Sequence, residues 1–197
     1  MNLPNKISIA RICLIPVFVL FFFLEFTGHY FVAAAIFAVA AATDFLDGHI
    51  ARSRNLVTNL GKFLDPIADK VLVATAFILL LTAKEAIFAP FGAAATAVYI
   101  TVSICVCVIL ARELIISAFR QIAAAAGIVL AAEKLGKYKT LFQDVCIVAL
   151  LAVGSCAGAA AEVVAYIGGG LFAIASVLTI ISGISYVVKN KQVLTSK

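Results

Sequence analysis

Four aspartates, Asp44, Asp47, Asp65 and Asp69, are the side chains of this sequence whose type and spacing best suit chemistry. They lie within the stretch DFLDGHIARSRNLVTNLGKFLDPIAD, in a chain that is otherwise strongly apolar. Burying one carboxylate in hydrocarbon is costly, and burying four without compensation is costlier still. We therefore expect positive charge to gather them. A pair of hard divalent cations held by carboxylates is suited to binding phosphates.

The spacing of these residues predicts two helices that share one site. Asp44, Asp47 and Gly48 fall at i, i+3 and i+4, so they lie on one helix face, and Asp65 and Asp69, four apart, lie on another. Two antiparallel helices joined by a loop over residues 53–62 would present both faces to one volume. Four carboxylates there repel one another unless they are protonated or bound to metal. Oxygen ligands without His or Cys favour Mg²⁺ or Mn²⁺ over zinc.

Two other interpretations of the aspartates stay open. They could be solvated charges at a helix–loop boundary, or they could mark an ion or proton pathway, because intramembrane acids are also found in transporters. Their clustering at one end of the predicted helices favours a site over a pathway. Gly48 and Gly61 lack a Cβ and allow close approach of a ligand, and Arg52 offers a planar donor fork for phosphate.

The composition indicates an all-α integral membrane protein that forms a single domain over residues 1–197. Hydrophobic residues make up 64% of the chain, charged residues 13%, and mean hydropathy is +1.16, whereas soluble domains are about half apolar and a quarter charged. The apolar runs are continuous, which argues against a β-barrel. We expect a short interfacial helix at the N-terminus, then six transmembrane helices over residues 7–26, 30–50, 63–82, 88–111, 141–161 and 163–188.

The net charge of +5 follows this topology and is no sign of nucleic-acid binding. If the N-terminus is cytoplasmic, six spans return the C-terminus to the same side, and every basic residue except Lys84 falls on that side. The same orientation places the aspartates at the cytoplasmic mouth. The basic residues assigned to the cytoplasm are Lys6, Arg11, Arg52, Arg54, Lys62, Lys70, Arg112, Arg120, Lys134, Lys137, Lys139, Lys189, Lys191 and Lys197.

Two further features of the predicted spans have structural explanations. The five cysteines are odd in number, lie in spans and form no CxxC pair, so we expect buried apolar thiols and neither a disulfide nor a metal site. The run Gly168, Gly169, Gly170 predicts a kink or a close helix crossing.

The aspartate stretch resembles the signature of the CDP-alcohol phosphotransferase family. The resemblance implies a six-helix membrane fold, usually a homodimer, with two divalent cations at the cytoplasmic mouth. It also implies transfer of a substituted phosphate from a CDP-linked donor to an alcohol, with release of CMP. The matching positions are Asp44-x2-Asp47-Gly48-x2-Ala51-Arg52-x8-Gly61-x3-Asp65-x3-Asp69.

The same resemblance implies roles for the matched residues. All four aspartates are implied as metal ligands, with Asp69 also the general base that takes the proton of the attacking hydroxyl. The implied binding site for the CDP-linked lipid includes Gly48, Arg52 and Gly61.

Basic residues later in the chain indicate an acceptor that carries a phosphate. Arg112 and Arg120 are eight residues apart, on nearly the same helix face, and with Lys137 and Thr140 they are suited to binding a dianion. Glu113 is expected to be a structural partner for a nearby cation. The alternative is that basic residues in this region attract anionic lipid headgroups. Lys134 and Lys139 are further candidates for binding the phosphate, and for them this alternative is as well supported as phosphate binding.

Four segments resemble bacterial members of the family that use glycerol 3-phosphate: residues 2–5, 60–70, 111–113 and 136–140. This resemblance implies a protein of the bacterial inner membrane that converts CDP-diacylglycerol and sn-glycerol 3-phosphate to phosphatidylglycerophosphate and CMP. Three alternatives stay open: a sister enzyme that uses inositol phosphate, serine or another alcohol, a divalent-cation transporter, and a membrane scaffold without activity.

Overall fold

The computed structural model describes residues 3–53, 59–125 and 134–191, and every regular element within them is helical. Side chains are described in these ranges except at residues 3–4, 44–53, 59–60, 62–63, 65, 125 and 134. Two short elements, α4 (Lys84–Phe88) and η1 (Ala89–Ala94), lie between the third and fourth long helices. The long helices are α1 (Leu3–Phe23), α2 (His29–Ser53), α3 (Asn59–Thr82), α5 (Ala95–Ala125), α6 (Lys134–Val153) and α7 (Gly158–Lys189). The prediction of an all-α protein is confirmed.

Several of these helices are apolar and long enough to cross a bilayer. Within the described ranges, three stretches meet this condition by length and composition, Asn5–Phe23, Lys84–Ala124 and Gly158–Lys189, and His29–Thr43 is a shorter apolar helix. The chain is therefore a membrane protein with several apolar helices. Of the remaining long helices, α2 and α3 carry the motif aspartates, and α6 carries Lys137 and Lys139.

The structure corrects the expected N-terminal interfacial helix. No separate short helix precedes the first span in the described part of the chain, because α1 runs without a break from Leu3 to Phe23. Pro4 lies in its first turn, where the missing N–H is not needed. No proline or glycine interrupts the chain from there to Ile15, so the helix continues into the apolar run.

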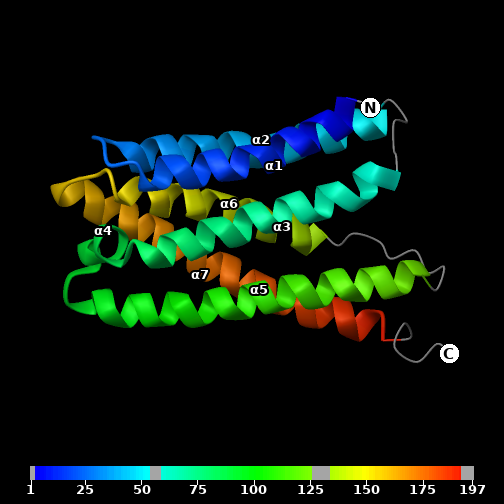
Figure 1. Cartoon of the computed structure of the whole chain (residues 1–197). Helices are drawn as coiled ribbons and strands as arrows, with labels where there is room; N and C mark the ends of the chain where they lie inside the picture. Colours follow the sequence, from blue (N-terminus) through cyan, green and yellow to red (C-terminus); the bar gives the residue numbers. More distant parts are fainter. Residues whose placement is uncertain (1–2, 54–58, 126–133, 192–197) are drawn as a thin grey trace.

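Successive long helices run in opposite directions, so their ends gather at two ends of one bundle (Figure 1). At one end, which we call the motif end, lie the starts of α1, α3 and α6 and the ends of α2, α5 and α7 (right in Figure 1). We call the opposite end the far end. Among the helix pairs, α6 and α7 have the most extensive contact, followed by α1 and α2. Most of the basic residues assigned to the cytoplasm belong to helices that reach the motif end, whereas Arg54 and Lys197 lie outside the described residues.

Glycine and proline account for two boundaries that the sequence misplaced. The fourth span was expected to begin at Phe88, but Pro90 and Gly92 interrupt the helix there, and Gly92 has a φ of 59°. The fifth span was expected over residues 141–161, but α6 runs from Lys134 to Val153 and a turn at residues 154–157 follows. Gly158, with a φ of 56°, begins α7. A positive φ is a conformation that glycine adopts at little cost.

Two of the three consecutive glycines of α7, Gly168 and Gly169, lie in close contact with neighbouring elements. A Cβ on Gly168 would lie 2.9 Å from Cδ2 of Leu150 on α6, and one on Gly169 would lie 3.2 Å from the ring of Phe91. The crossing alternative of the sequence prediction is therefore confirmed, and α7 is a single helix through this run. All five cysteines are free thiols, but the expected burial is found only for Cys146. Cys105 and Cys156 are partly buried, and the side chains of Cys13 and Cys107 are exposed. Exposure on this protein includes surface that lipid can cover, so both thiols are compatible with a membrane.

Candidate functional site

The aspartate motif is divided between the end of α2 and the start of α3, which meet at the motif end (Figure 1). Asp44 and Asp47 lie in the helical backbone of α2, which also carries Gly48 and Arg52. Asp65 and Asp69 lie in α3, as does Gly61. The prediction that both pairs lie on helices is therefore confirmed.

Only part of this motif has described side chains. Asp69 is partly buried on α3, and Gly61 is buried. The side chains of Asp44, Asp47, Arg52 and Asp65 lie outside the described set, and so does the environment of Gly48. Their convergence on one volume, and with it the two-metal site, stays a prediction.

The donor set is chemically suited to a hard divalent cation. Carboxylate oxygens are the ligands that Mg²⁺ and Mn²⁺ prefer. Among the side chains that the structure describes, no three His, Cys, Asp or Glu residues form a metal-binding group, and three of the four motif aspartates are outside that set. The fit therefore depends on residue type and on the placement of the two helix backbones.

A buried arginine borders the motif, and the sequence did not predict it. Arg11 on α1 is completely buried, and its Nε donates a 3.2 Å hydrogen bond to Oγ1 of Thr43 on α2. The Thr43 hydroxyl in turn donates to the carbonyl of Ala40 at 2.6 Å. Thr43 directly precedes Asp44. We had assigned Arg11 to the cytoplasmic end only by its charge, whereas the structure places its guanidinium inside the bundle.

A second charged cluster joins α5, α6 and α7. The Glu113 carboxylate accepts hydrogen bonds from Nζ of Lys139 at 2.6 Å and from Nη1 of Arg112 at 3.0 Å. Nη2 of Arg112 donates to Oγ of Ser182 on α7 at 3.0 Å. We call Arg112, Glu113, Lys139 and Ser182 the Glu113 cluster. The prediction that Glu113 is a structural partner for a cation is confirmed.

The Glu113 cluster is within electrostatic range of Lys70 on α3, and one of its hydrogen-bond donors, Nε of Arg112, has no partner among the described residues. Lys70, the residue after Asp69, is close enough to Glu113 to interact electrostatically with its carboxylate. Nε of Arg112 is buried and has no hydrogen-bond partner among the described residues. A buried donor without a partner is rare in proteins and calls for an explanation. An anion bound beside Arg112 would supply the missing acceptor.

Gly183 provides the space that Arg112 occupies. A Cβ at this position of α7 would lie 2.9 Å from Nε and 3.0 Å from Cγ of Arg112. Real Cβ atoms do not approach other atoms so closely without a shift of one partner. No pattern in the sequence indicates this role, because it depends on the packing of α5 against α7.

The other residues predicted for the acceptor phosphate have different surroundings. Arg120 is exposed, donates a 3.0 Å hydrogen bond to the hydroxyl of Tyr186 and lies over the Tyr186 ring. Lys137 is exposed, and the Thr140 hydroxyl donates to the carbonyl of Gly136 at 3.1 Å. No described contact joins these residues to the Glu113 cluster. The side chain of Lys134 lies outside the described set, whereas Lys139 is buried in the cluster.

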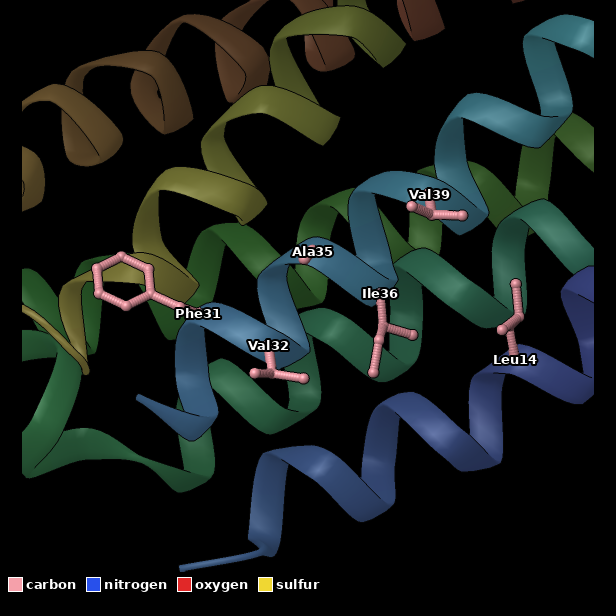
Figure 2. A pocket seen from close by; sticks show the side chains of 6 residues that line it. All are labelled: Leu14, Phe31, Val32, Ala35, Ile36 and Val39. Carbon is pink, nitrogen blue, oxygen red and sulfur yellow. The ribbon is translucent and has the colours of Figure 1, made fainter. Parts of the chain in front are cut away.

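An apolar groove between α1 and α2 lies apart from these polar groups. It has a volume of about 390 Å³, and Figure 2 shows Leu14 from α1 beside α2 residues such as Val32 and Ile36. Its lining has no polar side chain, so it offers nothing to bind a cation or a nucleotide. In a membrane protein it is suited to hydrocarbon. The lining residues are Leu14, Phe31, Val32, Ala35, Ile36 and Val39.

The fold is a membrane bundle with an acidic motif on two neighbouring helices, and comparison with known protein families identifies its class. The chain belongs to the CDP-alcohol phosphatidyltransferase family, which it matches over residues 1–181.

Relatives from several bacteria are similar over much or nearly all of this chain, and each is a CDP-diacylglycerol–glycerol-3-phosphate 3-phosphatidyltransferase. The protein of Rickettsia bellii is 38% identical over 185 residues, 94% of this chain and 93% of the relative. That of Shigella flexneri is 40% identical over 187 residues, 94% of this chain and 92% of the relative. That of Bacillus subtilis is 40% identical over 162 residues, 76% of each chain.

Proposed function

We propose that this protein transfers the phosphatidyl group of CDP-diacylglycerol to sn-glycerol 3-phosphate, giving phosphatidylglycerophosphate and CMP. The observation that carries the proposal is the similarity of 38–40% over more than nine-tenths of the chain to relatives named for this reaction. The membership of the family and the division of the motif between α2 and α3 support it.

In this proposal the motif residues bind the donor and activate the acceptor. Asp44, Asp47, Asp65 and Asp69 would hold two divalent cations, Mg²⁺ or Mn²⁺, which when bound offset the charge of the diphosphate. Asp69 would also take the proton of the attacking hydroxyl. The CDP-lipid site would include Gly48, Arg52 and Gly61.

The acceptor phosphate would bind beside the Glu113 cluster. Arg112 has the strongest structural support, because its side chain is partly buried and its buried Nε lacks a partner in the described part of the chain. Its partner Glu113 is also within electrostatic range of Lys70, the residue after Asp69. Glu113 and Lys139 would hold Arg112 in place. Arg120, near the end of α5, is proposed with it, as are Lys137 and Thr140 near the start of α6, because of their residue types and their positions on these helices.

The setting of the reaction is part of the same proposal. We place all six long helices across a bacterial inner membrane, with the motif end and both termini in the cytoplasm, because the basic residues gather there. The acyl chains of the donor would stay in the bilayer while its diphosphate reaches the motif. We also propose a homodimer, as the family resemblance implies.

One assay tests the reaction. The purified chain in detergent, supplied with Mg²⁺ or Mn²⁺, CDP-diacylglycerol and labelled sn-glycerol 3-phosphate, should release CMP and form labelled phosphatidylglycerophosphate. Release of CMP only with inositol phosphate, serine or another alcohol would show a sister enzyme. Metal flux into vesicles without any CMP release would show a transporter and overturn the proposal.

A further inference from the structure

A buried cation on α1 contacts the helix turn from which the aspartate motif begins. The Arg11 side chain has no exposed surface, and its Nε bonds to the Thr43 hydroxyl at 3.2 Å. Arg11 lies 32 residues before Thr43, so this hydrogen bond connects two helices and not neighbouring turns of one. Burying a guanidinium is costly unless its donors are satisfied. A sequence built only to pack α1 against α2 would place an apolar residue here.

The polar face of α1 extends beyond this contact. Asn5 and Ser8 are also buried, and with Arg11 they follow one another at intervals of three residues. Such spacing places the three side chains along one side of the first turns of α1, at the motif end. Beyond Arg11 the helix is apolar, with the buried Ile15 and Phe18 packed in the core. The polar face is therefore confined to the level of the motif.

We propose that Arg11 is a positioning residue for the aspartate motif and acts through Thr43. Each residue of a helix is rotated by about 100° from the one before it, so a contact at Thr43 fixes the direction of the adjacent Asp44 and, one turn later, of Asp47. The hydrogen bond from Arg11 on α1 fixes the rotation of α2 about its own axis and its position along α1. This inference rests on the proposed function, because the motif that Arg11 aligns is the proposed metal site.

The test compares variants at both ends of this hydrogen bond. Arg11→Gln and Thr43→Val should each lower kcat for CMP release by about 10- to 100-fold, the usual effect of losing a group that orients metal ligands. Each should also weaken Mn²⁺ binding, followed by electron paramagnetic resonance of the protein without substrate. Arg11→Lys keeps a donor and should recover part of the loss. The double variant should be no worse than Arg11→Gln, because the hydrogen bond between Arg11 and Thr43 is already lost in the single variant.

Thr82→Val is the matched control. The Thr82 hydroxyl donates to the carbonyl of Leu79 at 2.7 Å, with the same three-residue spacing as Thr43 and Ala40, but at the far end of α3. This variant should keep wild-type kcat and Mn²⁺ binding. Melting in detergent separates positioning from folding. The inference is overturned if Arg11→Gln lowers the melting temperature while the folded protein keeps wild-type kcat and Mn²⁺ binding, or if Thr43→Val behaves like Thr82→Val.

The outcomes also separate this inference from the proposed function. If the wild-type protein forms no phosphatidylglycerophosphate but its Mn²⁺ binding still depends on Arg11 and Thr43, the reaction is wrong and the positioning role stands. If the wild-type protein catalyses the reaction and the variants match the control, the reaction stands and the positioning role is wrong.

Discussion

Lys139 on α6 and Glu113 on α5 form an ion pair of 2.6 Å, and the Lys139 residue is 6% exposed. The same carboxylate oxygen bonds to Arg112, so one acid lies between two cations and offsets their mutual repulsion. The pair also joins two consecutive helices across residues 126–133. Its loss should therefore affect both the folded state and the orientation of Arg112.

Breaking this ion pair from one side should destabilise the protein. Glu113→Gln leaves Lys139 buried without its counter-charge, and such a change costs about 3–5 kcal/mol in the proteins where it has been measured. We expect a lower melting temperature in detergent. The double variant Glu113→Leu with Lys139→Met should melt between Glu113→Gln and the wild type, since it removes Lys139 together with its counter-charge but still takes the carboxylate from Arg112. A double variant that melts lower than Glu113→Gln would contradict a pair whose main effect is mutual neutralisation.

Asp69→Asn tests the proposed general base. The amide cannot accept the hydroxyl proton, and general base catalysis contributes about 10²–10⁴-fold, so CMP release should fall by at least about 10²-fold. Helix content and melting should change little, because Asp69 is only partly buried. The control is Glu85→Gln, an exposed acid on α4 at the far end. Equal activity of the two variants would remove Asp69 from the mechanism.

Gly183→Ala tests the space around Arg112. Its Cβ would lie 2.9 Å from Nε of Arg112, so the arginine must move. Losing one charge-assisted hydrogen bond to the acceptor phosphate should raise KM for glycerol 3-phosphate about tenfold or more, with a smaller effect on KM for CDP-diacylglycerol. Steady-state kinetics with each substrate varied in turn would measure both.

The matched control for this substitution is Gly170→Ala on the same helix. A Cβ there meets no atom within 4 Å, so its kinetics should match the wild type. If Gly183→Ala shows the same acceptor KM as Gly170→Ala, Arg112 does not bind the acceptor phosphate.

Reporter fusions test the proposed topology. Alkaline phosphatase, which is active only outside the cytoplasm, should be active when fused after Ala83 and inactive when fused within residues 54–58 or after Lys191. A fluorescent protein that folds in the cytoplasm should show the opposite pattern. The reason is the bias of basic residues toward the motif end. Phosphatase activity at the 54–58 fusion would place the motif on the wrong side of the membrane.

The elements that carry the motif were predictable because their signals are local. Aspartates at spacings of three and four residues indicate helices on either side of a polar loop, and α2 and α3 are those helices. The partner role of Glu113 was also predictable, because an acid in an apolar helix needs a cation. Such inferences need residue type and spacing alone.

Features that depend on tertiary packing were not predictable. Arg11 looks like any basic residue near a membrane end, and only the packing of α1 against α2 shows that it is buried. Gly183 is one of 12 glycines, and its role appears only when α7 lies against Arg112. The start of α5 was misplaced because the apolar run continues through Pro90 and Gly92. Hydropathy does not reveal that the helix is interrupted at these two residues.

The close crossing at Gly168 affects how the proposed reaction exchanges its soluble compounds. Gly168 of α7 lies directly against Leu150 of α6, and these two helices have the most extensive contact of the helix pairs, so they are closely packed at this level. We expect such packing to exclude polar solutes from this part of the bundle. Glycerol 3-phosphate would then arrive, and CMP depart, through a single aqueous compartment. The ratio of CMP to glycerol 3-phosphate in that compartment would then influence the reverse reaction, and their concentrations on the other side of the membrane would not.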